Sequence, residues 1–214
     1  MFGTTLAYLT AEKTATNTFT LGSVEIALTE DSFKESSAVN VVPRQQIDKD
    51  PVVSNTGNNS SVAFLEVRIP RMTMTTVAAD GTRGETKLSP LYTMHTTDQK
   101  GSFGTAQAVN NGWIQLESRN ETDEIVYIYG WNEVLAKGGK TAPLFNFVEV
   151  ANYTEEDHLS AGQDANIDVK AYAIQSDNVI APGTVSALDA DKLADIYEIY
   201  LKQQQGKVSA PSGT

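Results

Sequence analysis

Apolar and polar positions alternate more strictly between residues 8 and 21 than anywhere else in the chain. The apolar residues of this stretch occupy odd positions: Leu9, Ala11, Ala15, Phe19 and Leu21. Successive side chains of a β-strand point to opposite faces, so the pattern predicts one long strand, or two collinear strands, with an apolar face. After Gly22 the apolar positions become even: Val24, Ile26 and Leu28. A phase shift at a glycine indicates a bulge or a tight bend.

Turn residues divide the rest of the chain into short apolar stretches that are typical of β-strands. The expected strands cover residues 39–42, 51–54, 62–69, 113–116, 124–131, 144–150 and 166–174. The clearest turns are 55–60, 117–122 and 137–140. We expect Pro70 to end the strand 62–69, with Glu66 and Arg68 facing solvent.

The strand expected at residues 124–131 is apolar on both faces. One face carries Ile125, Tyr127, Tyr129 and Trp131, and the other carries Val126 and Ile128. Such a pattern predicts a strand that is buried on both sides. Together with Trp113, these aromatic residues either pack in the core or form a platform for sugars, and the apolar pattern favours the core.

The end of the chain has a different period. Apolar residues recur every three or four positions: Leu193, Ile196, Tyr197, Tyr200 and Leu201. This spacing predicts an amphipathic helix over about residues 187–203, and Ser186 to Asp189 resembles a capping box with Asp in place of Glu. Many short strands and one late helix predict an all-β fold, a two-sheet β-sandwich with a C-terminal helix.

Composition and charge exclude several classes of function. The chain has 214 residues, of which 16 are Lys or Arg and 27 are Asp or Glu, giving a net charge of −11. Nucleic acids and anionic membranes attract positive surfaces, so neither is the expected partner. Cysteine is absent, which excludes disulfides, thiol nucleophiles and cysteine–metal sites. No apolar run is long enough for a membrane span.

Candidate catalytic and metal-binding residues are few. The two histidines, His95 and His158, lie in no His-Glu-x-x-His motif, and we expect both at the surface. There is no Gly-x-Ser-x-Gly motif and no phosphate-binding glycine loop. Asp48 with Asp50, or the acidic loop 155–157, would offer oxygen ligands to calcium, but neither follows a known loop spacing. We expect no catalytic residue, no metal site and no cofactor.

Several segments resemble one family when they are taken together. They are residues 3–10 (GTTLAYLT), 16–26 (TNTFTLGSVEI), 49–58 (KDPVVSNTGN), 144–148 and 167–175 (IDVKAYAIQ). Their order and spacing are similar to those of the TasA/camelysin family of exported Gram-positive surface proteins. Residues 71–143 carry little of the resemblance, and Pro43-Arg44 stands where family members often have Pro-Gly.

The resemblance implies a jelly-roll-like two-sheet sandwich that is secreted with a signal peptide and assembles into extracellular fibres of the biofilm matrix or cell surface. Signal cleavage would fall between Ala7 and Tyr8. The mature N-terminal segment would act as a donor strand that completes the sheet of the next subunit. The donor residues are Tyr8, Leu9, Thr10, Ala11, Glu12, Lys13, Thr14 and Ala15.

The expected organisation of the chain follows from these patterns. Residues 1–7 are the tail of a signal peptide, and residues 8–21 are the N-terminal strand and possible donor. The remaining parts are the sandwich 22–183, with an irregular or hairpin-bearing insertion at about 71–112, the helix 184–205 and a disordered tail 206–214. The expected partners are copies of the chain itself and other matrix or cell-wall components, without nucleic acid and without a membrane span in the mature chain.

Two physical arguments bear on the donor strand and its alternatives. A segment with period-two alternation supplies both ladder hydrogen bonds and side chains for an incomplete sheet, and an unlike donor and acceptor propagate as an open filament. Alternatively, residues 8–21 are the first strand of their own sheet. The chain would then be a monomeric cell-surface adhesin or binding sandwich, or a camelysin-like peptidase.

Overall fold

The computed structural model describes residues 23–38, 41–101, 106–154, 165–180 and 187–208. The strands are β1 (Ile26–Thr29), β2 (Gln46–Asp48), β3 (Val52–Asn55), β4 (Ser61–Val77), β5 (Arg83–Pro90), β6 (Tyr92–His95), β7 (Trp113–Asn120), β8 (Glu124–Trp131), β9 (Phe147–Val150) and β10 (Asp168–Gln175). Short 3₁₀ turns occur at η2 (Glu35–Ala38), η3 (Thr97–Gln99) and η5 (Ser176–Asn178), and α2 (Ala190–Val208) ends the described chain.

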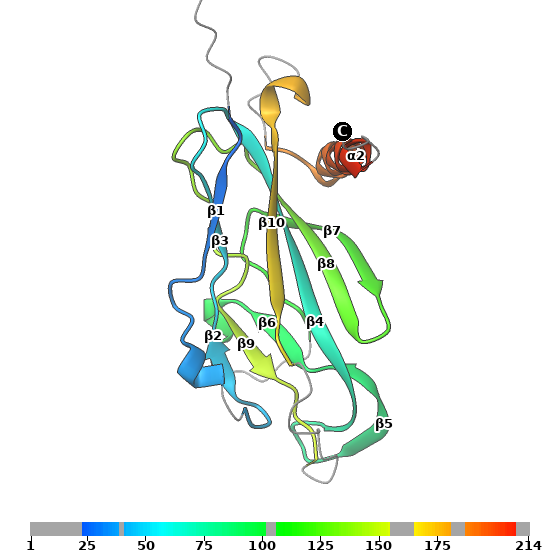
Figure 1. The fold of residues 1–214 in the computed structure, drawn as a ribbon. Helices are drawn as coiled ribbons and strands as arrows, with labels where there is room; N and C mark the ends of the chain where they lie inside the picture. The colour runs from blue at the N-terminus through cyan, green and yellow to red at the C-terminus, as the bar shows by residue number, and fades with distance from the viewer. Residues whose placement is uncertain (1–22, 39–40, 102–105, 155–164, 181–186, 209–214) are drawn as a thin grey trace, which may run out of the picture.

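The strands form two packed layers (Figure 1). One layer is an antiparallel sheet in the order β10-β4-β8-β7, and β5 pairs with the far end of β4. The other layer contains the sheet β2-β9-β6 and the pair β1-β3. Hydrogen bonds from Thr141 N to Val53 O (2.9 Å) and from Leu144 N to Pro51 O (2.9 Å) continue this layer between β3 and the chain leading to β9. The expected all-β sandwich with a C-terminal helix is therefore confirmed.

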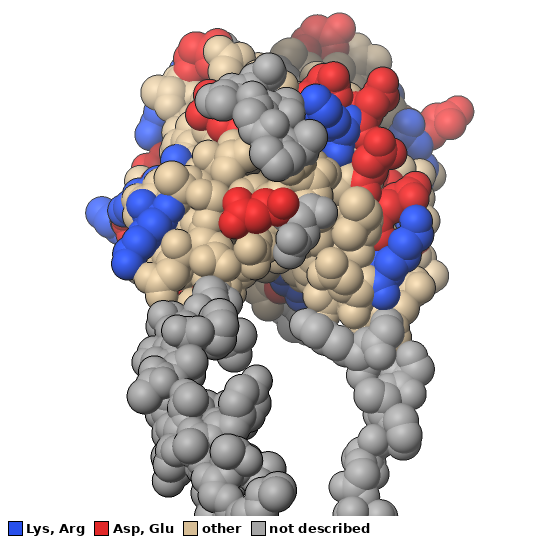
Figure 2. All heavy atoms as spheres, turned by 90° about the horizontal axis from the view of Figure 1, so that it is seen from above, with Lys and Arg blue, Asp and Glu red and all other residues tan. Residues whose placement is uncertain are grey.

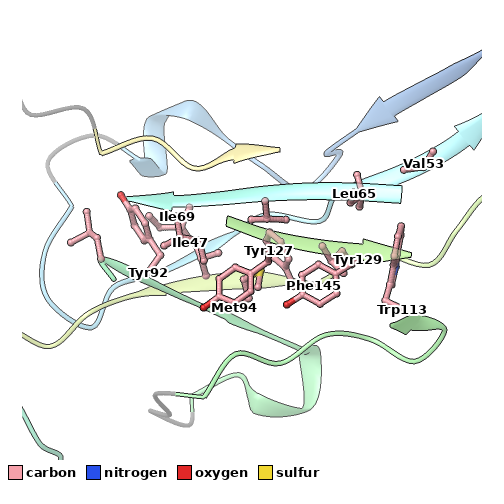
Figure 3. Close-up of a cluster of buried hydrophobic side chains, with 14 of the residues drawn as sticks. Ile47, Val53, Leu65, Ile69, Tyr92, Met94, Trp113, Tyr127, Tyr129 and Phe145 are labelled. Carbon is pink, nitrogen blue, oxygen red and sulfur yellow. The ribbon is translucent and has the colours of Figure 1, made fainter. Parts of the chain in front are cut away.

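The main core lies between the two layers (Figure 3). Alternate residues of β4 face it: Ala63, Leu65, Val67 and Ile69. Tyr127, Tyr129 and Trp131 of β8 pack beside them, as the alternation predicts, and Val126 and Ile128 are buried on the opposite face of that strand. The rings of Trp113 and Trp131 meet edge to face, with centroids 5.3 Å apart. These aromatic side chains are core residues, so an aromatic sugar platform at this strand is wrong.

A second apolar cluster joins α2 to the opposite face of the sheet. Val62 and Phe64 of β4 contact Leu193 and Ile196 of the helix, and all four side chains are buried. Gly130 of β8 makes this approach possible, because a Cβ there would lie 3.1 Å from Leu193 Cδ2. The amphipathic helix is thus confirmed.

The bounds and two further details of the expected helix differ from the structure. The helix begins at Ala190 and continues to Val208, into the stretch 206–214 that was expected to be a disordered tail. Leu201 is 39% exposed and is not part of the buried stripe. Asp189 caps the helix itself, since its Oδ1 accepts a hydrogen bond from Lys192 N at 2.9 Å, as an N-cap carboxylate does. The expected partner in the capping box, Ser186, lies outside the described residues. Among the helices that the structure describes, none is both long and apolar enough to span a bilayer.

The Asn-Thr-Gly turn after β3 holds the start of the chain's first described strand. The side chain of Asn55 is buried and donates hydrogen bonds to the carbonyls of Asn59 and Leu135, both at 2.8 Å. Gly57 lies against the backbone before β1: a Cβ there would be 2.5 Å from Ser23 O. The turn therefore requires glycine at this position, because any side chain would push β1 away.

Pro70 does not end its strand, which continues to Val77. At Pro70 the strand β4 leaves β8, whose last pair is Pro70 with Glu124, and from Arg71 it pairs with β5. Proline has no N–H group and cannot donate a ladder hydrogen bond. Pro70 lies at the junction between the β8 and β5 pairings, where the loss of this donor interrupts neither ladder.

Residues 71–112 contribute to the core as well as forming a hairpin. The β4–β5 hairpin projects from the sandwich, but Leu91 and Met94 are buried in the main core and β6 pairs with β9. The strand expected at residues 39–42 is absent at Val41 and Val42, where Gln45 N bonds to Val42 O in a turn. The strand begins instead at Gln46, in β2.

Candidate functional site

The residues expected to act in assembly lie at the start of the chain. The donor residues 8–15 and the cleavage positions Ala7 and Tyr8 fall outside the described residues. The described part of the chain nevertheless contains the surfaces with which a donor strand could pair, namely the edges of the two layers. Each edge can be compared by its length, its regularity and the side chains beside it.

β10 and β1 form neighbouring edges of the two layers. Among the described strands, β10 pairs with β4 alone and β1 pairs with β3 alone. The two strands run side by side (Figure 1), and their Cα atoms approach within 8 Å. β10 is the longer edge, because its eight residues keep one regular register with β4 from Asp168 to Gln175.

Apolar side chains follow the inner side of these two edges. Ile26 and Leu28 of β1, and Val169 and Ala171 of β10, pack against the main core but are only partly buried. The intervening residues of β10, Asp168 and Lys170, are exposed. We call this feature the β10 edge: a regular strand with charged residues outside and a half-buried apolar row inside.

The other edges differ from the β10 edge in ways that hinder strand addition. β7 has a register shift between Gln115 and Glu117, and α2 packs beside it. β5 is exposed, carries alternating charges at Arg83, Glu85 and Lys87, and ends in a proline. At β6, Ala108 N donates to Met94 O at 2.9 Å, so part of that edge is already paired. Among the described strands, β1 is also a regular edge with apolar residues on its inner side, but it has only four residues, and the β10 edge with eight is the longest of this kind.

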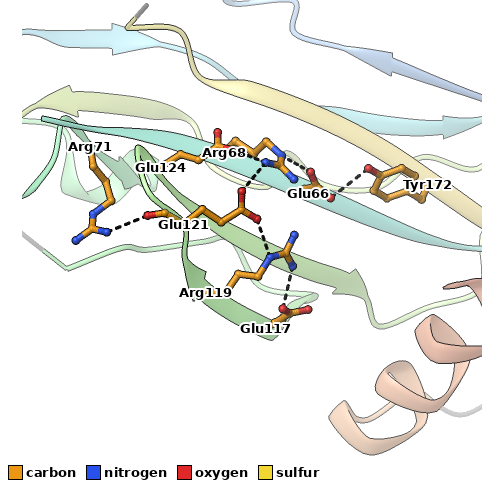
Figure 4. Close-up of polar contacts among 8 residues, drawn as sticks. All are labelled: Glu66, Arg68, Arg71, Glu117, Arg119, Glu121, Glu124 and Tyr172. Carbon is orange, nitrogen blue, oxygen red and sulfur yellow. Dashed lines mark hydrogen bonds and ion pairs between the residues drawn. The ribbon is translucent and has the colours of Figure 1, made fainter.

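A ladder of charged side chains crosses the outer face of the sheet that carries the β10 edge (Figure 4). Arg68 of β4 contacts three carboxylates: Glu66, Glu121 and Glu124. Glu66 was expected to face solvent, but it is only 6% exposed, and Tyr172 of β10 donates a hydrogen bond to it at 3.2 Å. The ladder thus links β10, β4, β8 and the β7–β8 turn.

The ionisation of these groups follows from their neighbours. The hydrogen bond with Glu66 raises the pKa of Arg68, so the guanidinium remains charged. Burial, and then the charge of Glu66, raise the pKa of Tyr172, which keeps its hydroxyl as a donor. On the exposed side, the hydrogen bond from Arg119 lowers the pKa of Glu121. Charged side chains of both signs therefore connect the strands of the sheet next to the β10 edge.

We expect the substitution Arg119→Met to raise the pKa of Glu121 towards its ordinary value. Arg119 Nε donates to Glu121 Oε1 at 3.0 Å, and this hydrogen bond is the largest cause of the lowered pKa. A lowered carboxyl pKa stabilises the fold at neutral pH and loses this effect as the pH falls through it, so the variant also loses that part of its acid sensitivity. Carbon-detected NMR titration of the Glu121 carboxyl measures the shift.

Lys202→Met is the matched control, since Lys202 pairs with Glu198 on the helix at 3.3 Å and makes no contact with the ladder. An unchanged pKa of Glu121 in Arg119→Met would contradict the geometry of the ladder.

The residues considered for catalysis or metal binding are placed as follows. His95 was expected at the surface, but it is 1% exposed and stacks on Phe147, with ring centroids 5.1 Å apart. Asp48 pairs with Lys100 at 3.0 Å, and Asp50 accepts two hydrogen bonds from Ser32 at 2.8 Å. In the part of the chain that the structure describes, no three His, Asp or Glu side chains come together as metal ligands would. His158 and the loop 155–157 lie outside that part.

The alternation of β10 is visible in the sequence, but its position as an open edge is not. Its apolar residues Val169, Ala171 and Ala173 are visible as a period-two row. Whether a strand has one neighbour or two depends on pairing with distant segments, here residues 61–68, and no local pattern reports it.

Comparison with known protein families, with curated proteins and with solved structures finds no match to this chain.

Proposed function

We propose that the chain is a structural subunit of an extracellular fibre of the biofilm matrix or cell surface. In this proposal the N-terminal segment 8–15 of one subunit pairs as a donor strand with the β10 edge of the next. The observation that carries the proposal is the β10 edge itself, which is eight residues long, regular, open among the described strands and apolar on its inner side. Export and fibre formation are inferred from the resemblance to the TasA/camelysin family.

The donor and the acceptor match in length and in pattern. The donor segment has eight residues, as β10 has, and its inward apolar set would be Leu9, Ala11 and Ala15, with Lys13 on the same face between Ala11 and Ala15. Backbone pairing would supply hydrogen bonds to the β10 edge, and these small apolar side chains would extend the row of Val169 and Ala171. Because donor and acceptor are different surfaces, each added subunit leaves one of each free, and growth continues as a filament.

The spacing of the two neighbouring edges sets a condition on this assembly. Hydrogen-bonded strands lie about 4.8 Å apart, so a strand between two others needs them roughly 9.6 Å apart. β1 and β10 approach within 8 Å, so a donor strand that reaches both must move β1 outward by at least about 2 Å. We therefore propose that β10 pairs with the donor strand and that β1 moves outward to make room for it.

Val169→Lys is expected to prevent filament formation without unfolding the subunit. The side chain of Val169 points to the inner side of the β10 edge and is half-buried, so a lysine there places a charge in the path of the donor's apolar face. At a half-buried position the lysine stem can bring its ammonium to water, so the subunit remains folded. Electron microscopy of the protein beginning at Tyr8 should show filaments for the unsubstituted chain and none for the variant.

Val169→Leu is the matched control, because it keeps the same position apolar and should still polymerise. Filaments from Val169→Lys that equal those of the unsubstituted chain would exclude the β10 edge as the acceptor. An absence of filaments from the unsubstituted chain would exclude the fibre itself.

A further inference from the structure

A cavity of about 300 Å³ lies where the β4–β5 hairpin leaves the sandwich, between this hairpin and β9. This volume is at the lower end of the range of small-molecule sites, roughly 300–1,000 Å³. Its apolar walls include Val77 and Ala78 of the hairpin and Ala151 after β9. The hydrogen bond from Asn152 Nδ2 to Val77 O, at 2.8 Å, holds the two walls together.

A buried carboxylate contributes to the wall on the β9 side. Glu149 lines the cavity and is 6% exposed. Its hydrogen bond from Gln46 Nε2 is long, at 3.3 Å, and His95 Nε2 lies 3.8 Å from its Oε2, too far for a hydrogen bond. Neither ring nitrogen of this buried histidine has a hydrogen-bond partner within the described structure. A buried charge is costly unless a cation or donors compensate it, so this wall favours a cationic ligand group.

Cationic side chains line the same cavity. Lys87 comes from the hairpin, and Arg44 comes from the turn before β2. Arg44 has a φ of 65°, which is rare for a residue other than glycine, and its N–H is held by Val150 O at 3.1 Å. Such strained backbone positions cluster at binding sites. These two residues favour a ligand that also carries an anionic group.

We infer that this cavity binds a small zwitterion of the α-amino acid class. The ammonium group of the ligand would pair with Glu149, its carboxylate with Lys87 and Arg44, and an apolar side chain would contact Val77 and Ala151. A simple anion would be repelled by the carboxylate of Glu149, and a simple cation would be repelled by the two basic residues Lys87 and Arg44. A free amino acid and the zwitterion of a short peptide share this chemistry. The inference is independent of fibre assembly, since neither wall belongs to the β10 edge.

NMR titration of the purified chain with L-valine tests the inference. Valine is expected to shift the amide signals of Ala78 and Ala151 in a saturable way. N-acetylvaline, which lacks the ammonium, and valinamide, which lacks the carboxylate, should each bind at least about tenfold more weakly, equivalent to about 1.4 kcal/mol. Valyl-valine in a parallel titration separates the two sources: tighter binding of the dipeptide assigns a peptide, and tighter binding of valine assigns a free amino acid.

Two substitutions connect the binding to the charged walls. Glu149→Gln and Lys87→Met should each weaken valine binding by about tenfold or more. Lys87 is exposed, so its variant remains folded whatever the effect of the buried substitution. Lys170→Met, on β10, is the control and should bind valine normally. Equal binding of acetate and valine would identify a plain anion site and overturn the inference, as would the absence of any shift at millimolar valine.

Discussion

Deletion of residues 8–15 is expected to abolish filament formation and to leave a folded monomer. The described sandwich has its core between β4, β8 and β9, and the core residues that the structure describes all lie outside the deleted segment. The deleted chain keeps the β10 edge but has lost the strand that would add to it, so it can accept a subunit and cannot donate to one. Sedimentation velocity and electron microscopy measure the loss of assembly, and circular dichroism verifies the fold.

A mixture of two variants makes this test sharper. The deletion variant would accept but not donate, whereas Val169→Lys would donate but not accept. Mixed in equal amounts, they should form heterodimers and nothing larger, because each pair leaves neither a free donor nor a free acceptor. Fibres from the deletion variant alone would contradict assembly through this segment. A monomeric mixture would show that residues 8–15 and the β10 edge are not partners.

Leu193→Ala is expected to lower the free energy of unfolding by about 2–5 kcal/mol. The side chain of Leu193 is fully buried between α2 and Gly130 of β8, so its removal leaves a cavity at the centre of the helix–sheet contact. Leu201→Ala is the matched control: it makes the same substitution in the same helix, at a side chain that is 39% exposed, and its effect should be about 0.5 kcal/mol or less. Urea unfolding measures both values.

Hydrogen exchange in α2 adds a second readout to this comparison. The amides of the helix should exchange faster in Leu193→Ala, because the helix undocks more often from the sheet. Equal losses of stability in the two leucine variants would mean that both residues belong to one apolar stripe, as the spacing alone predicts. That result would contradict the described position of the helix.

Much of the fold was predictable because many of its strands have a local signature. β8 follows from an apolar run between turns, β10 follows from alternation, and α2 follows from its three- and four-residue spacing. The local sequence pattern did not predict the burial of a side chain where that burial depends on a residue far away in the sequence. Glu66 reads as a solvent-facing residue but is buried beside Tyr172, more than a hundred positions away. His95 reads as part of a polar stretch but stacks on Phe147 of β9.

The candidate site was less predictable than the fold. The period of residues 8–15 identifies a strand-forming segment, but an acceptor edge is defined by a neighbour that is missing, which no residue reports. Pro70 illustrates the same limit within one strand. Proline usually ends a central strand, yet here it marks the point at which β4 exchanges one neighbour for another. Interior and edge positions become distinct only when the pairing of the whole sheet is known.

The length of β4 has a mechanical consequence. β4 runs unbroken over 17 residues and pairs with β10 on one side and with β8 on the other. In the proposed fibre, tension along the strands would pass from the donor to β10 and then to β4. Force parallel to the strands would act in shear on all the hydrogen bonds of a ladder at once. Force perpendicular to the strands would instead break these hydrogen bonds one after another. We therefore expect the fibre to resist stretching along its strands far better than peeling, with its breaking force set by the unfolding rate of the sheet under load.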